Sequence, residues 1–132
     1  VGWRTLDLGR HQAPYYLTGD QVAALDWLGA SATQDDVVLA DLSFGQYVPM
    51  WSDARAYVAH WANTLDFYGK RDQAAAIVSG RMPAAERDSL VAKYRVTYLV
   101  YEGDGPAPWA GDPAYPLAFE RGRVSIYRAL PR

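Results

Sequence analysis

The sequence predicts an α/β domain, a three-layer, Rossmann-like fold with a mostly parallel sheet, helices on both faces and a C-terminal antiparallel β-hairpin. Helical patterns alternate with short apolar runs along the chain, which is typical of parallel sheets covered by helices. The runs at 37–40 and 96–101 are rich in β-branched and aromatic residues, as expected of buried strands. Two further runs at 117–119 and 123–127 flank Gly122, and this arrangement predicts the hairpin.

Composition places the chain among ordinary globular domains. It has 132 residues, half of them hydrophobic, and a net charge of -2, so we expect no nucleic-acid partner. The absence of cysteine excludes disulfides, thiolate metal sites and cysteine nucleophiles. No apolar stretch approaches the roughly 18 residues that a spanning helix needs, so we expect this chain itself to be soluble. Because it begins at Val1 without an initiator Met, we expect it to be a piece of a longer protein.

The first half of the chain predicts one long helix and two strands. Residues 1–14 are predicted to be an N-terminal arm or linker, and residues 15–132 a single α/β domain. Thr18 and Gln21 have the spacing of a capping box, and an apolar stripe at three-residue steps continues the helix to about residue 31. The strand at 37–40 follows. We then expect one or two helical turns within 46–51 and a second strand at 55–59.

The second half predicts two helices, the strongest strand and the hairpin. One helix is expected to begin at Asn63 or Thr64 and to end near Gly80. Another is expected from Pro83 to Lys93, since Pro suits the first turn of a helix and a basic residue suits its last. The strand at 96–101 precedes a long loop, 102–115, that is rich in Pro and Gly.

The segment 57–64 is the first candidate site. An apolar run ends there in a histidine and a tryptophan, at the carboxyl end of a predicted strand, where ligands gather in open α/β sheets. The predicted ligand-binding residues are Tyr57, His60, Trp61, Asn63 and Thr64. Under the alternative interpretation, Trp61 is simply packed and His60 is hydrogen-bonded to a neighbouring loop.

A small hydrolase is the second candidate. Ser43, His60 and Glu102 each follow a predicted strand, and a Ser, a His and an acid together permit nucleophilic catalysis. However, Ser43 lacks the first Gly of a G-x-S-x-G turn, and it could equally cap a helix. With two histidines in unrelated contexts and no glycine-rich phosphate loop, we expect no metal site and no cofactor.

Five stretches, taken in order, resemble segments of a known family. They are 24–28 (ALDWL), 36–49 (DVVLADLSFGQYVP), 57–64 (YVAHWANT), 94–101 (YRVTYLVY) and 119–128 (FERGRVSIYR). The family is the C-terminal extracytoplasmic region of polytopic bacterial membrane proteins of the GT-C glycosyltransferase type. Ala59 and Asn63 depart from its pattern, which has Gly and Glu at these positions.

The resemblance implies a role in the cell envelope. Such proteins use lipid-linked sugar donors, and their catalytic carboxylate is expected in the membrane part. This chain would then be a non-catalytic accessory domain at the extracytoplasmic face of the membrane, with no activity alone. It would dock on the transmembrane part of the same polypeptide, or help to bind an acceptor saccharide or lipid-linked sugar. A purely structural interaction domain is the remaining alternative.

Overall fold

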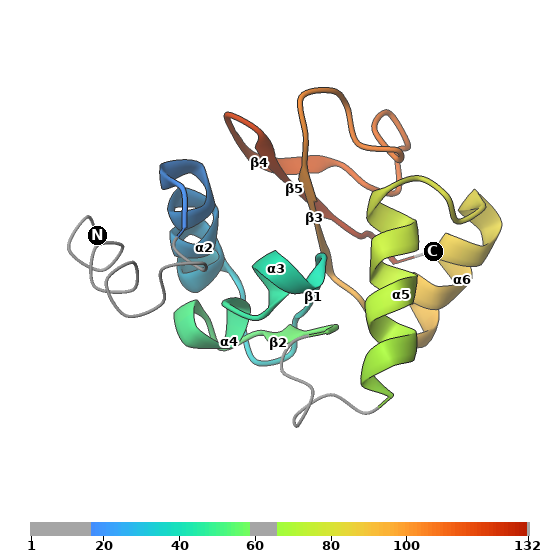
Figure 1. Cartoon of the computed structure of the whole chain (residues 1–132), viewed down its shortest axis with the longest axis horizontal. Coiled ribbons are helices and arrows are strands. Elements are labelled where there is room, and N and C mark those ends of the chain that lie inside the picture. Colours follow the sequence, from blue (N-terminus) through green and yellow to red (C-terminus); the bar gives the residue numbers. More distant parts are fainter. Residues whose placement is uncertain (1–16, 59–65, 132) are drawn as a thin grey trace.

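The computed structural model describes residues 17–58 and 66–131, which share one five-stranded sheet of order β2-β1-β3-β5-β4 (Figure 1). The strands are β1 (Val37–Leu39), β2 (Arg55–Ala56), β3 (Tyr98–Glu102), β4 (Leu117–Arg121) and β5 (Val124–Arg128). The first three strands run parallel, and β5 pairs antiparallel with both β3 and β4. The predicted α/β architecture with a closing antiparallel hairpin is confirmed.

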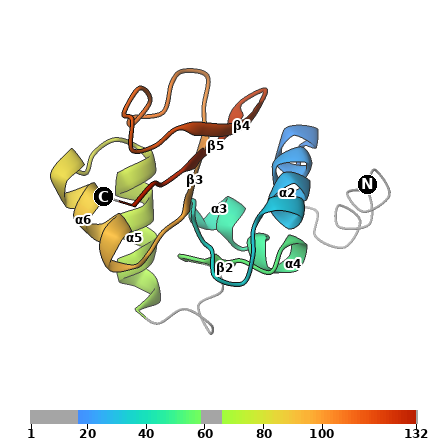
Figure 2. The same ribbon diagram turned by 180° about the vertical axis from the view of Figure 1, so that it is seen from behind.

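Helices cover both faces of the sheet (Figures 1 and 2). On one face lie α2 (Gly19–Ser31), α3 (Leu42–Gly45) and α4 (Val48–Trp51), and on the other lie α5 (Phe67–Val78) and α6 (Ala84–Lys93). Successive strand residues point to opposite faces, so the central strands contribute side chains to two hydrophobic cores, one on each face of the sheet. Val38 and Val100 pack under α2, α3 and α4, whereas Leu39 and Leu99 pack under α5 and α6.

Helix α2 forms where its capping residues predict it. The Thr18 side chain accepts a hydrogen bond from the Gln21 backbone N–H at 3.2 Å, and the Gln21 side chain accepts one from the Thr18 N–H at 2.9 Å. These two bonds satisfy donors that have no partner inside the helix. Val22, Leu25 and Leu28, the predicted apolar stripe, are all buried against the sheet.

One short helix was not predicted, and two element boundaries differ from the prediction. The helical turns expected within 46–51 are present as α4, and α3 precedes them, capped by the Asp41 side chain. Strand β2 spans only Arg55–Ala56, and one further backbone hydrogen bond to β1 follows, from the Tyr57 N–H to the Val38 carbonyl at 2.8 Å. Helix α5 begins at Phe67, after Asp66 takes a left-handed backbone conformation with φ 54°. The predicted start at residues 63–64 lies outside the described residues.

The long segment between β3 and β4 is packed against the body of the domain. Trp109, with only 1% of its surface exposed, lies edge-on to Tyr101 and Tyr127. Arg87 of α6 pairs with Asp112 and lies over the ring of Tyr115. These contacts make the segment part of the core under α5 and α6.

Candidate functional site

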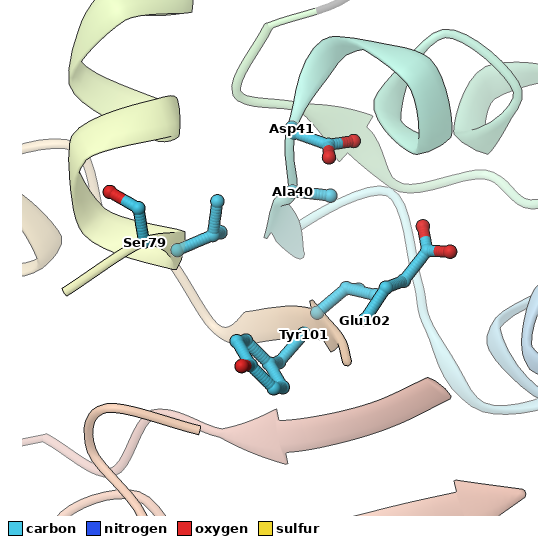
Figure 3. Close-up of a pocket in the computed structure, with 7 residues that line it drawn as sticks. Ala40, Asp41, Ser79, Tyr101 and Glu102 are labelled. Atoms are coloured by element: carbon cyan, nitrogen blue, oxygen red, sulfur yellow. The ribbon is translucent and has the colours of Figure 1, made fainter. Parts of the chain in front are cut away.

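A pocket of about 260 Å³ opens at the carboxyl ends of β1 and β3 (Figure 3). It is lined by Ala40, Asp41, Val78, Ser79, Val100, Tyr101 and Glu102. The chain leaves β1 along the α3 face to reach β2, and returns to β3 along the α5 face. The pocket therefore lies where the connections diverge, the place at which α/β sheets bind ligands.

Asp41 is held in the pocket by its role as the cap of α3. Its Oδ1 accepts hydrogen bonds from the Phe44 backbone N–H at 3.2 Å and from the Ser43 hydroxyl at 2.8 Å. Asp is among the preferred N-cap residues because its side-chain oxygen reaches the first free N–H groups of a helix. Among the described residues, Oδ2 has no hydrogen-bond partner.

Glu102, the last residue of β3, supplies the second carboxylate. Its Oε2 accepts a hydrogen bond from Gln21 Nε2 at 3.0 Å, and Oε1 has no such partner within residues 17–58 and 66–131. Burial raises the pKa of this carboxyl, and the neighbouring charge of Asp41 raises it further. The bond from Gln21 and the charge of Arg123 lower the pKa, but they do not outweigh burial.

Tyr101 and Ser79 form the remaining polar lining. The Tyr101 ring is set edge-on to Trp109, with ring centres 6.1 Å apart. Ser79 follows α5, and its hydroxyl donates to the Ala76 carbonyl and accepts from Arg81 Nε at 2.9 Å. Figure 3 shows the Asp41 and Glu102 carboxylates on one side of the pocket and Ser79 across from them. The site can therefore offer carboxylate oxygens and an aromatic ring to a small ligand.

Of the predicted ligand-binding residues, the structure describes Tyr57. Its ring is only 3% exposed, its hydroxyl donates to Gln73 Oε1, and it lies edge-on to Tyr94. Burial, with the charges of Tyr94 and Asp66, raises its pKa to about 12. The other four predicted residues, His60, Trp61, Asn63 and Thr64, lie outside the described part of the chain, so their role stays a prediction.

The hydrolase prediction has two of its three residues in the described structure. Ser43 is exposed in the first turn of α3, and its hydroxyl donates to Asp41. Glu102 lies in the pocket, where it is bonded to Gln21. His60 is not described, so the structure does not test whether these three residues meet.

Sequence reasoning missed three pocket residues: Asp41, Ser79 and Tyr101. The signal for Asp41 was present, because it comes directly after the strand at 37–40, as Glu102 comes after the strand at 96–101. No local pattern could have indicated Ser79, since only packing brings the end of α5 to this edge of the sheet.

No group of three or more His, Cys, Asp or Glu residues that could hold a metal ion occurs within residues 17–58 and 66–131. Over the same residues, no helix has the length and apolarity needed to cross a membrane.

Fold and pocket together define a three-layer α/β domain. Its small polar site lies at the carboxyl ends of β1 and β3, where the chain connections run to opposite faces of the sheet. The fold is similar to the crystal structure of the C-terminal globular domain of an oligosaccharyltransferase from Archaeoglobus fulgidus. The similarity has a TM-score of 0.65 and covers 86% of this chain and 98% of that one, at 16% sequence identity. No protein-family model and no curated protein matches the chain.

Proposed function

We propose that this chain is a non-catalytic, extracytoplasmic accessory domain of a membrane glycosyltransferase-like protein. The observation that carries the proposal is the extent of the structural similarity, which includes 98% of the oligosaccharyltransferase domain and 86% of this chain. A match of this extent covers most of both chains and not just a short shared motif. The step from fold to function is an analogy, supported here by the sequence resemblance to membrane glycosyltransferases.

In this function the domain holds an acceptor sugar or docks on the membrane part of the same polypeptide. The polar edge of the sheet supports the first role, because Asp41 and Glu102 are both held there by hydrogen bonds from the protein. Groups fixed in this way bind a ligand without losing much conformational entropy. The arrangement is suited to positioning a substrate for chemistry that takes place elsewhere.

We also propose that the segment 57–64 forms a second part of this binding site. Strand β2 is parallel to β1, so its carboxyl end lies at the same edge of the sheet as Asp41. Val58 passes close to α3, since a Cβ added at Gly45 would lie 2.5 Å from the Val58 carbonyl oxygen. His60, Trp61, Asn63 and Thr64 follow directly in the chain.

The test is to delete the region 17–131 from the complete polypeptide and to measure sugar transfer from a lipid-linked donor in membranes. We expect transfer to be lost while the remaining protein still inserts in the membrane, and we expect the isolated chain to catalyse no transfer. A complete gene without membrane-spanning segments would contradict the proposal, as would transfer activity of the isolated chain.

A further inference from the structure

We infer that the pocket at the carboxyl ends of β1 and β3 binds a single sugar residue, and that it prefers neutral and amino sugars to acidic ones. The choice of sugars as the ligand class rests on the proposed function. The preference among sugars rests on the pocket itself.

The size of the pocket limits the ligand to about one ring. Its volume of about 260 Å³ is slightly below the roughly 300–1,000 Å³ that is typical of sites for drug-sized ligands. Ala40 and Val100 form part of its lining, directly beside the two carboxylate-bearing residues. A monosaccharide unit, or one residue of a longer glycan that enters from solvent, suits these dimensions.

The carboxylate oxygens of the pocket favour a ligand that donates hydrogen bonds. Each carboxylate has one oxygen engaged, Asp41 Oδ1 by Phe44 and Ser43, and Glu102 Oε2 by Gln21. The second oxygen of each carboxylate has no hydrogen-bond partner within the described ranges. An ionised carboxylate can only accept, so sugar hydroxyl or ammonium groups are its complement.

Charge sets the preference among sugars. Within residues 17–58 and 66–131, the residues that line the pocket include two acids and no Lys, Arg or His. Arg123, whose charge acts on Glu102, forms an ion pair with Asp104 at 3.0 Å. Arg81, beside Ser79, donates through Nε to the hydroxyl of that residue. A uronic acid would place a third carboxylate next to Asp41 and Glu102, whereas the ammonium group of an amino sugar is attracted to both.

Tyr101 supplies an apolar surface next to these acceptors. Its ring lies on the pocket lining, and the edge-on contact with buried Trp109 fixes its orientation. Tyr combines an apolar ring with a polar hydroxyl, a combination that suits a sugar with both C–H and hydroxyl groups. The pocket thus provides contacts for both kinds of surface.

The experiment titrates the complete 132-residue chain with methyl glucoside, glucosamine and glucuronate, one at a time, while backbone amide NMR signals are followed. We expect glucosamine to bind at least tenfold more tightly than glucuronate, with methyl glucoside between them. The largest shifts should fall on Asp41, Tyr101 and Glu102. No shift with any probe, or equal affinity for glucuronate and glucosamine, would overturn the inference.

Two conservative variants locate the site. Asp41→Asn keeps a good helix cap and removes the charge, and Glu102→Gln keeps the shape of the side chain. Each should weaken glucosamine binding at least tenfold, and the double variant should lose the preference over glucuronate. Asp53→Asn, which changes an exposed acid ahead of β2, is the matched control and should bind as the natural chain does. Unchanged binding in both pocket variants would place the site elsewhere and contradict the inference.

This experiment and the deletion experiment can fail separately. If no sugar binds the chain but deletion still abolishes transfer, the inference about the pocket is wrong and the accessory function stands. If the complete gene has no membrane part but the chain binds glucosamine through Asp41 and Glu102, the pocket stands and the proposed function is wrong.

Discussion

The side-chain amide of Gln21 joins the start of α2 to the end of β3. Its Oε1 accepts a hydrogen bond from the Thr18 backbone N–H at 2.9 Å, and its Nε2 donates to Glu102 Oε2 at 3.0 Å. One residue thus completes the capping box and orients a carboxylate of the pocket. Because of this double role, a single substitution at Gln21 can remove the hydrogen bond to Glu102 and keep the helix cap.

Gln21→Glu should lower the free energy of unfolding at neutral pH by about 1–3 kcal/mol. A Glu can still complete the capping box, but it cannot donate to Glu102 and it places a second negative charge beside that carboxylate. Thermal unfolding followed by circular dichroism measures the change. In a Glu102→Gln background the same substitution should cost much less. An equal loss in both backgrounds would show that Gln21 acts only through the cap.

Arg87→Ala should destabilise the domain by about 3 kcal/mol. The residue is 6% exposed, pairs with Asp88 at 3.2 Å and Asp112 at 3.7 Å, and lies over the Tyr115 ring. Its removal therefore eliminates two of the contacts between α6 and the segment after β3 and leaves the partly buried Asp112 without this ion pair. Arg71→Ala is the control, because its pair with Asp72 is exposed and is expected to contribute about 0–1 kcal/mol. Urea unfolding of both variants gives the comparison, and similar losses would contradict the assigned role.

Gly45→Ala should cost about 1–3 kcal/mol, the usual effect of an extra methyl group in a packed site. The new Cβ would lie 2.5 Å from the Val58 carbonyl oxygen, a backbone atom that can move only if the connection after β2 moves with it. Gly19→Ala, at the first residue of α2, meets nothing within 4 Å and should be neutral or slightly stabilising. Melting temperatures of the two variants test the contrast, and an unchanged Gly45→Ala protein would refute the close approach.

Tyr57 and Tyr115 should make the fold sensitive to alkali. Burial is the largest cause that raises the pKa of each from 10.0 to about 12, and for Tyr115 the hydrogen bond to Asp88 adds to it. In the unfolded chain these hydroxyls ionise near pH 10, whereas the folded protein retains their protons to about pH 12. Their contribution to stability is therefore complete below pH 10 and is lost as the pH rises through 12.

The double variant Tyr57→Phe and Tyr115→Phe should lose less stability than the natural chain over this interval. Denaturant unfolding at a series of alkaline pH values measures the difference. Tyr68→Phe, at a residue that is 67% exposed, is the control and should follow the natural chain. Parallel decline in the double variant and the natural chain would assign the alkaline transition to other groups.

Much of the fold was predictable because its signals are local. The Thr18–Gln21 spacing predicted the start of α2, and the run from Val96 to Tyr101 predicted β3 to within two residues. The turn of the hairpin contains Gly122, whose φ of 59° is the left-handed conformation that glycine favours. Each of these features depends on residues within a few positions of one another.

The exposure of individual side chains was less predictable than the elements themselves. In α5, Tyr68 is 67% exposed, whereas Ala74 and Ile77 are buried. In α2, the Asp26 Oδ1 accepts a hydrogen bond from Trp51 Nε1 of α4 at 2.9 Å, a partner 25 residues away in sequence. Helical periodicity identifies a face of a helix, but the neighbouring element decides which side chains that face covers.

The sequence by itself determined the order of the elements, the capping of α2 and the hairpin turn. It also placed polar residues such as Asp41 and Glu102 at or directly after the ends of strands. Only the tertiary structure decided which strand ends meet. The parallel register that sets Leu39 beside Leu99 brings Asp41 and Glu102 to one edge of the sheet, and α5 closes that edge with Ser79. Hydrogen bonds between strands act across long separations in sequence, so no local pattern could specify this pairing.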